Sequence, residues 1–164
     1  MPIKLPDLPP EAVHEDFLRF YEYWSRAAPA GALPGRQHID PLVDLPRLIP
    51  SLVLYDVVPS DDELRFRVRV AGEVLVEIMG SNPAGRYIDD FVLPERRRQV
   101  NAAFTQVARM RVAHYWENQM WTAGRQYIRM QRLALPLARD GRIVDMVFAC
   151  HVRVDAPTDS PEEK

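Results

Sequence analysis

Cysteine is almost absent from this sequence, which has Cys150 alone among its 164 residues. One thiol cannot form a disulfide within the chain, so the fold does not require an oxidising compartment. Long apolar runs are also missing, since none approaches the ~18 residues that a membrane-spanning helix needs. The first ten residues contain four prolines instead of the basic and apolar stretches of a signal peptide. We therefore expect a cytoplasmic protein with no membrane partner.

Neither sign of charge is in excess, because 21 Lys and Arg residues face 23 Asp and Glu residues. A role with nucleic acid would therefore need a local basic patch. Arg65, Arg67 and Arg69 form one such cluster and residues 96–98 form a second. The chain lacks the aromatic pair, interleaved with basic residues, that stacks single-stranded bases. We interpret both clusters as charged surface or interface and predict no nucleic-acid partner.

Metal and nucleophile motifs are missing as well. The four histidines, at positions 14, 38, 114 and 151, and Cys150 show neither H-x-x-x-H nor C-x-x-C spacing. We predict no metal site. His114 and His151 are interpreted as surface residues or as residues satisfied by neighbours, and Cys150 as core packing.

Asp89 and Asp90 form an adjacent carboxylate pair near the expected mouth of a pocket. Acid–base catalysis needs two carboxylates whose environments push their pKa values apart, which sequence neighbours rarely achieve. Both residues come just before a predicted helix, where the helix dipole stabilises an anion. Helix capping is therefore the favoured interpretation.

What is present is an ordinary globular composition, with 47% hydrophobic and 27% charged residues. A length of 164 residues favours one domain with one core. Residues 11–28 carry an apolar stripe at helical spacing, which predicts an amphipathic N-terminal helix within residues 1–29. A helix this aromatic must pack against its own domain or a partner subunit. We predict a homodimer whose interface includes Val13, Phe17, Phe20, Tyr21 and Trp24.

Five segments are rich in strand-forming residues and bounded by turn residues. They are residues 51–58, 64–70, 112–121, 126–138 and 143–154. Turns are predicted at residues 122–124 and 140–141. In the last strand, five apolar residues alternate with polar ones, so we expect the apolar set to face the core and His151 to point away from it. That apolar set is Val144, Met146, Phe148, Cys150 and Val152.

Between the second and third strands the apolar spacing becomes helical. Short helices are predicted at residues 42–48, 74–80 and 87–91, and a longer one from Pro94 to about Arg111. The element order contains no strand–helix alternation of the kind that builds a parallel sheet. It predicts an α+β fold in which a five-stranded antiparallel sheet is covered by helices on one face, with an extra N-terminal helix. The domain should span residues 30–155, and residues 156–164 should be a disordered acidic tail.

Several short pieces, in this order and spacing, resemble a bacterial family of small PAS-like domains typical of alphaproteobacteria. They cover most of residues 20–150, and they are Tyr23-Trp24, Leu33-Pro34 with Arg36, Ile39-Asp40-Pro41, Leu48-Ile49-Pro50, Phe66-Arg67 through Ala71-Gly72, Gly85-Arg86, and Leu135-Pro136-Leu137 followed by Asp140-Gly141-Arg142. The resemblance implies sheet order 2-1-5-4-3. It also implies a pocket between the sheet and the helices of residues 72–111, and a sensory role.

Within such a family, two cofactors are disfavoured. A haem module usually takes an axial histidine from its long helix, but the helix predicted from Pro94 to Arg111 has none, and His114 lies just beyond it. A light-sensing flavin module would carry its reactive cysteine on a pocket helix, whereas Cys150 lies in the final strand. Non-covalent flavin stays open, and the sequence identifies no cofactor.

The segment from His114 to Trp121 contains polar-tipped aromatic residues that suit either core packing or contact with a small ligand. If a ligand binds, Arg86 is a candidate partner for an anion. The residues expected near the ligand are Phe66, Ile78, Met79, Arg86, Tyr87, Phe91, Phe104, Trp116, Met146 and Phe148.

Three functions fit these observations. The main hypothesis is a non-enzymatic PAS-type sensory and signalling module that binds a small organic ligand or a signalling protein. The second is a structural or adaptor protein with a fully packed core, acting through its outer sheet face. The third is a small isomerase or lyase with a conical α+β pocket that uses Asp89, Asp90 or His114.

Overall fold

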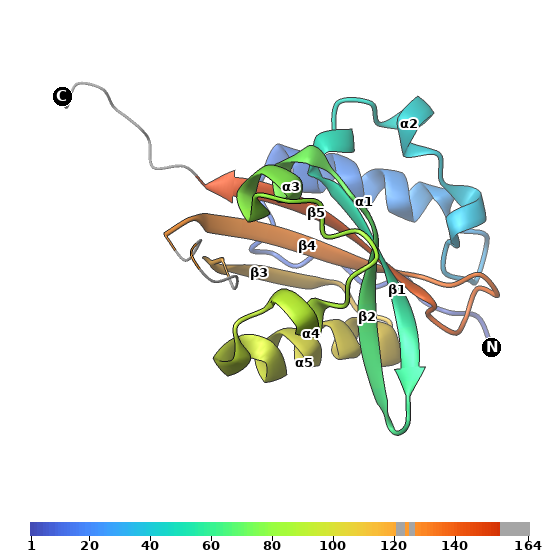
Figure 1. The fold of residues 1–164 in the computed structure, drawn as a ribbon. Helices are drawn as coiled ribbons and strands as arrows, with labels where there is room; N and C mark the ends of the chain where they lie inside the picture. Colours follow the sequence, from blue (N-terminus) through green and yellow to red (C-terminus); the bar gives the residue numbers. More distant parts are fainter. Residues whose placement is uncertain (121–123, 125–126, 155–164) are drawn as a thin grey trace.

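The computed structural model describes residues 1–120, 124 and 127–154. Its centre is an antiparallel sheet in the order β2-β1-β5-β4-β3, which confirms the predicted fold class (Figure 1). The predicted turn at 122–124 falls largely, and the predicted tail at 156–164 entirely, outside the described residues. The strands are β1 (Leu52–Ser60), β2 (Glu63–Ala71), β3 (His114–Gln119), β4 (Arg129–Leu137) and β5 (Met146–Val154).

Helices precede the sheet and link its second and third strands: α1 (Glu15–Ala27), α2 (Pro41–Asp44), α3 (Glu73–Met79), α4 (Ile88–Phe91) and α5 (Pro94–Met110). Helix α1 begins later than predicted, because His14 caps it by accepting a hydrogen bond from the Asp16 amide at 3.0 Å. Gly80 ends α3 with a φ of 81°, which a side chain would strain. Among the described residues, no helix has the length and apolarity needed to cross a bilayer.

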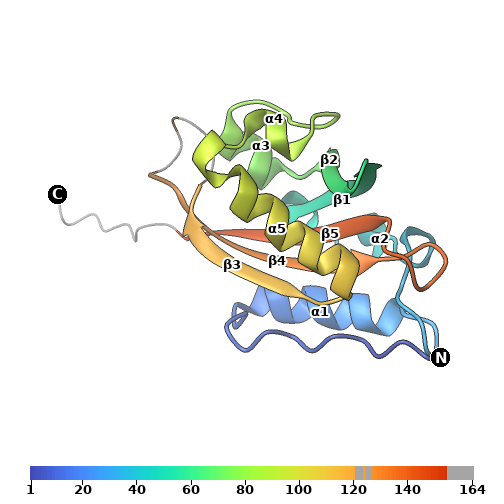
Figure 2. The ribbon, with the colours of Figure 1, turned by 90° about the horizontal axis from the view of Figure 1, so that it is seen from below.

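Helices cover both faces of the sheet. Helix α1 lies on one face, and α3, α4 and α5 lie on the opposite face (Figure 2). On the α1 side, the rings of Phe20 and Phe148 meet edge to face at 4.7 Å. On the α5 side, Phe104 packs against Tyr55 at 4.8 Å and Phe66 at 5.4 Å. We call these two surfaces the α1 face and the α5 face.

This double covering corrects the orientation expected for the last strand. Phe148 and Met146 point to the α1 face, because alternate residues of a strand share one face and Phe148 packs on α1. His151 points to the α5 face and is only 1% exposed, so the expectation that it points away from the core is wrong. Alternation of apolar and polar residues predicts a strand with one buried side, whereas β5 is buried on both sides.

The N-terminal segment packs along α1 on the side away from the sheet (Figure 2). The Ile3 amide donates to the Gly31 carbonyl at 2.7 Å, and the Tyr21 hydroxyl donates to the Pro6 carbonyl at 2.6 Å. Ile3, Leu5 and Leu8 are partly buried against the core. Helix α1 is thus held between the sheet and the start of the chain.

Candidate functional site

A cavity of about 350 Å³ lies between α5 and the β3–β4 edge of the sheet. Its α5 wall includes Ala102 and Ala103, whose short side chains leave space opposite the Trp116 ring. This volume is at the lower end of the ~300–1,000 Å³ typical of small-molecule sites. The lining residues are Gln99, Val100, Ala102, Ala103, Gln106, His114, Trp116 and Arg132.

Three neighbouring strands place one polar row on the α5 face. Trp116 of β3 pairs with Arg132 of β4, which in turn pairs with His151 of β5. Cross-strand partners share a face, and Arg132 packs against Phe104 of α5, so all three side chains point toward that helix. Arg132 and His151 are each 1% exposed.

Arg132 is held by a histidine and by aromatic rings. Its Nη2 donates to His114 Nδ1 at 2.8 Å, and its guanidinium carbon lies 4.8 Å from the Phe104 ring centre and 5.7 Å from that of Trp116. Its Nε is buried and has no hydrogen-bond partner in the described part of the chain. Burial lowers the pKa of Arg132 to about 10, so the side chain remains a cation at neutral pH.

The described residues provide no counter-ion for this cation. The ion pairs formed within residues 1–120 and 127–154 involve other arginines and His14, and none includes Arg132. Buried charges in proteins are usually paired, because removing an ion from water is costly. Arg132 is therefore an exception that requires an explanation.

The groups around Arg132 are uncharged at neutral pH. Burial and then the nearby Arg132 cation lower the pKa of His114 to about 4 and that of His151 to about 3. Burial raises the pKa of the Tyr55 hydroxyl, and Arg132 opposes that shift. The Tyr55 hydroxyl and both ring nitrogens of His151 have no partner among the described residues. We call Tyr55, His114, Arg132 and His151 the polar cluster.

This arrangement suits binding better than acid–base catalysis. General acids and bases work best when their pKa lies near the working pH. Burial has moved the pKa values of Tyr55, His114 and His151 further from neutrality, and the pKa of Arg132 is still about 10. A cation and neutral hydrogen-bond donors, set against aromatic and aliphatic walls, can instead fix the orientation of a small molecule.

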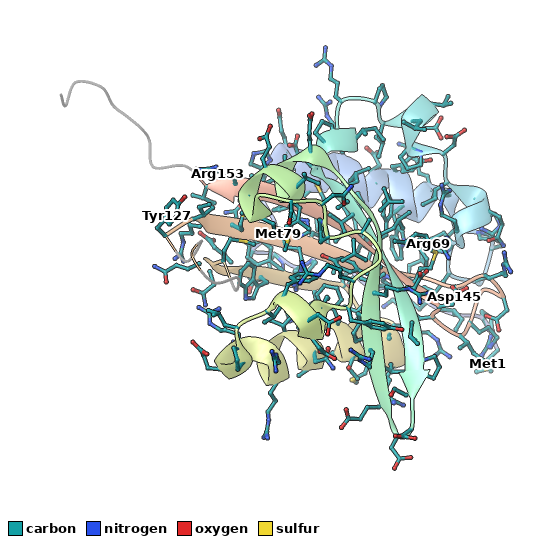
Figure 3. All side chains as sticks on the ribbon, viewed as in Figure 1. Met1, Arg69, Met79, Tyr127, Asp145 and Arg153 are labelled. Atoms are coloured by element: carbon teal, nitrogen blue, oxygen red, sulfur yellow. The ribbon has the colours of Figure 1, made fainter. Side chains whose placement is uncertain are left out.

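The structure brings six of the predicted ligand residues to the α5 side of the sheet. Phe66, Ile78, Phe91 and Phe104 are buried there, and Trp116 lines the cavity. Met79 is half-buried at the end of α3, in front of the sheet (Figure 3). Of these six residues, Trp116 lines the cavity, and the other five lie on the α5 side of the sheet outside the cavity lining.

Four predicted ligand residues lie elsewhere. Phe148 and Met146 face α1, so the sheet separates them from the cavity. Arg86 is exposed, where its Nη2 donates to the Asp90 carbonyl at 3.4 Å. Tyr87 lies under the Arg65 guanidinium, 3.9 Å from its ring centre, on the outer side of β2.

The predicted dimer residues divide into two groups. Phe17, Phe20 and Trp24 are fully buried against the chain's own sheet, and the Trp24 Nε1 donates to the Pro136 carbonyl at 2.8 Å. Val13 precedes the helix and is 74% exposed, and Tyr21 is half-buried. A partner subunit would therefore have to contact α1 through residues outside its buried stripe.

The two candidate catalytic carboxylates form ion pairs with Arg65 near the protein surface. Arg65 Nε lies 3.0 Å from Asp89 Oδ2, and Arg65 Nη2 lies 3.8 Å from Asp90 Oδ1. Asp90 Oδ2 also accepts a hydrogen bond from the Tyr87 amide at the start of α4. His114 belongs to β3 and to a different site, so the structure does not unite the three proposed catalytic residues. No cluster of three metal-ligating side chains occurs among the residues that the structure describes.

Sequence reasoning missed Tyr55, Arg132 and His151 as site residues. A signal was present: the strand from Leu133 to Leu137 is apolar throughout, which indicates a strand covered on both faces. Arg132 directly precedes this run and lies on the same face as Ala134, so its side chain would then point into the protein. The missing information was that α1 covers the second face.

A larger hollow of about 690 Å³ lies between α5 and the β1–β2 hairpin. Its walls are mostly charged or polar surface side chains, which water satisfies without a ligand. They include Asp62, Glu63, Asp89, Arg97, Arg98, Asn101, Gln106 and Arg109. Each space has one lining residue with a buried, unpaired polar atom, Asn101 Oδ1 in the larger hollow and Arg132 Nε in the smaller cavity. The smaller cavity is the better candidate, because its unpaired atom belongs to a buried cation.

Comparison with known proteins gives a family match. A family model described as PAS domain matches residues 13–150. A comparison with curated proteins gave no match.

Three solved structures are among those to which the chain is similar. One comes from work on light-oxygen-voltage domain mechanism with a flavin analogue, with a TM-score of 0.49 and 14% identity, covering 71% of this chain and 86% of that one. The light state of the blue-light photoreceptor Aureochrome1 LOV gives 0.43 and 16%, covering 68% and 87%. A sensory box histidine kinase/response regulator from Burkholderia thailandensis gives 0.40 and 20%, covering 64% and 78%.

Proposed function

Because the chain belongs to the PAS domain family, we propose that it is a non-enzymatic sensory module that holds a small organic molecule between its sheet and α5. The observation that carries this proposal is the cavity lined by Arg132, whose buried Nε has no partner within the described chain. Buried polar groups in folded proteins are normally satisfied, by protein, water or ligand. A bound molecule would satisfy the Arg132 Nε here.

Native mass spectrometry with an absorbance spectrum tests this function on the protein as purified. We expect a small molecule bound at one copy per chain and released on denaturation. Ala103→Phe should abolish that binding, because the larger side chain fills the cavity. Ala84→Phe makes the same change at an exposed loop position and should leave it intact. If Ala103→Phe retains the same molecule at full occupancy, the cavity is not the site.

We also propose that the module signals in the cytoplasm through association with a second copy or a signalling protein. The supporting feature is apolar surface near the start of α1, where Leu18 is 47% exposed and Val13 is 74% exposed. Size-exclusion chromatography with light scattering should show a dimer that Leu18→Glu dissociates. Leu42→Glu changes an equally apolar, exposed position outside α1 and should have no effect. A wild-type monomer at all concentrations would rule out the homodimer.

A further inference from the structure

The buried Arg132 guanidinium identifies the kind of molecule that the cavity accepts. A buried cation without a counter-ion is unfavourable, because the protein interior screens charge poorly and replaces few of the hydrogen bonds made by water. The nearest groups, His114, Phe104 and Trp116, supply one hydrogen bond and two ring faces but no negative charge. A ligand that brings a negative charge would remove this cost.

The donors on the α5 face are arranged for an acceptor-rich group. A guanidinium has only N–H donors, so His114 Nδ1 accepts from Arg132 and the His114 proton lies on Nε2. The hydrogen bond to His114 uses Nη2 of Arg132, whereas the Arg132 Nε–H has no partner among the described residues. The Tyr55 hydroxyl and a ring N–H of His151 are also unpaired among the described residues and lie on the same face, but neither residue lines the cavity, so Arg132 is the donor assigned to the ligand.

We propose that the ligand is a small organic carboxylate whose negative charge pairs with Arg132. The proposal rests on the small-molecule function proposed above and specifies its chemistry. A planar carboxylate matches the fork of guanidinium donors, which bind it through two parallel hydrogen bonds in favourable geometry. Val100, Ala103 and the Trp116 ring provide apolar contact for the rest of the molecule.

Charge favours a carboxylate over a phosphate. A phosphate group carries close to two negative charges at neutral pH, and its recognition sites usually combine several cationic or backbone donors. The polar cluster has one cation, because His114 and His151 are both uncharged near neutrality. One carboxylate balances that single charge.

Thermal unfolding with matched probes tests the assignment, starting from protein that has been unfolded and refolded to remove any bound molecule. Sodium acetate, sodium benzoate, benzamide and inorganic phosphate are compared at constant ionic strength. Benzoate should raise Tm by roughly 2–4 °C or more at saturation, and acetate should raise it less. Benzamide has almost the same shape without the charge and should have little effect, as should phosphate. Equal stabilisation by benzamide and benzoate, or stabilisation by phosphate alone, would overturn the carboxylate assignment.

Variants at Arg132 separate a ligand-binding role from a structural one. Arg132→Met should weaken benzoate binding by at least about 30-fold, the usual effect of removing one member of a buried charge pair. Without ligand, the same variant should be as stable as wild type or more stable, because it removes an unpaired buried charge. A structural arginine would show the opposite, with a lower Tm and unchanged benzoate affinity.

Two further variants keep the test informative if Arg132→Met folds poorly. Ala103→Phe keeps Arg132 but fills the cavity, so it should abolish benzoate binding. Arg19→Gln removes an exposed arginine of α1 and should change nothing. Unchanged affinity in Ala103→Phe, combined with full benzoate binding by any folded Arg132 variant, would refute the proposal.

The outcomes distinguish this inference from the function on which it rests. If native mass spectrometry of the purified protein finds a neutral molecule and carboxylates do not stabilise the refolded chain, small-molecule binding stands and the carboxylate assignment fails. If the purified protein carries no molecule and none of the four probes shifts Tm, both proposals fail together.

Discussion

The two faces of the sheet differ in how completely their polar groups are paired. On the α1 face, Trp24 donates its only polar hydrogen to the Pro136 carbonyl, and the aromatic rings of Phe20 and Phe148 interlock. On the α5 face, Tyr55, Arg132 and His151 carry buried polar atoms without partners among the described residues. Among the described residues, the buried side-chain polar atoms of the α1 face are thus paired, which suits stability, and several on the α5 face are unpaired, which suits binding. Substitutions on the two faces should therefore behave differently.

The largest effect is expected from Trp24 on the α1 face. Trp24→Ala should lower the free energy of unfolding by about 3–5 kcal/mol, because it leaves a large cavity and an unpaired carbonyl. Trp24→Phe keeps most of the volume and should cost less. Urea unfolding followed by circular dichroism measures both variants. Benzoate affinity should not change in Trp24→Phe, and a clear loss of affinity there would break the division between the faces.

The next largest effect is an acid sensitivity that originates on the α5 face. His151 has a pKa of about 3 in the fold, against about 6.5 in the unfolded chain. As pH falls below 6.5, the unfolded chain therefore binds a proton that the fold excludes, and stability is lost until the fold itself is protonated near pH 3. The expected loss is about 2 kcal/mol between pH 6.5 and pH 5. The nearby Arg132 cation also lowers the pKa of His151. The pKa of His114 is lowered too, so His114 likewise reduces stability in acid.

His151→Leu should flatten this pH dependence, which urea unfolding at pH 5, 6 and 7 measures. A variant that keeps the wild-type slope would show that His151 binds its proton over the same pH range in the fold as in the unfolded chain. The polar cluster would then gain a second cation at pH 5.

Two variants, each of which removes one tyrosine hydroxyl, compare the two faces, and each should change the free energy of unfolding by about 1.5 kcal/mol or less. Tyr21→Phe removes a bonded hydroxyl beside α1 and should destabilise the fold by about 0.5–1.5 kcal/mol. Tyr55→Phe removes an unpaired hydroxyl on the α5 face and should leave stability unchanged or raise it by about 1 kcal/mol. Thermal unfolding of ligand-free protein measures the pair. The same loss in both variants would mean that the Tyr55 hydroxyl has a partner after all.

The smallest effect is expected at the rim of the sheet. Asp56 accepts from Arg67 at 3.2 Å and from Arg69 at 2.9 Å, but both arginines are largely open to water. Asp56→Asn should therefore cost less than about 1 kcal/mol, and the cost should shrink further in high salt. Urea unfolding at two salt concentrations checks this. A larger loss of unfolding free energy that does not depend on salt would mean that this ion pair is buried in the core on the α1 face.

Most secondary structure was predictable because each element follows a simple period. Helix α5 begins at Pro94 as expected, since proline suits the first turn and its apolar residues recur at helical spacing. The order of the strands came from a family resemblance, and the structure confirms it. Helix ends were less accurate, because capping by His14 depends on a side chain that is not among the common caps.

The site was harder to predict because it depends on which face each strand buries. In β5, Phe148 and His151 are both buried, so alternation alone could not assign the pocket side. Charged residues normally point to water, and this expectation hid Arg132. The aromatic wall, including Phe66 and Phe104, was found because apolar residues between helices and sheet are buried whatever the function.

Both outermost strands of the sheet contain charged residues, among them three arginines in β2 and one glutamate in β3. Strand β2 alternates Arg65, Arg67 and Arg69 with its apolar residues, and β3 holds Glu117, whose carboxylate contacts Arg129 at 3.2 Å. An open strand edge is a template on which other chains can add strands, and charged side chains make that addition unfavourable. Copies of this protein should therefore resist joining edge to edge into fibrils, even at high concentration.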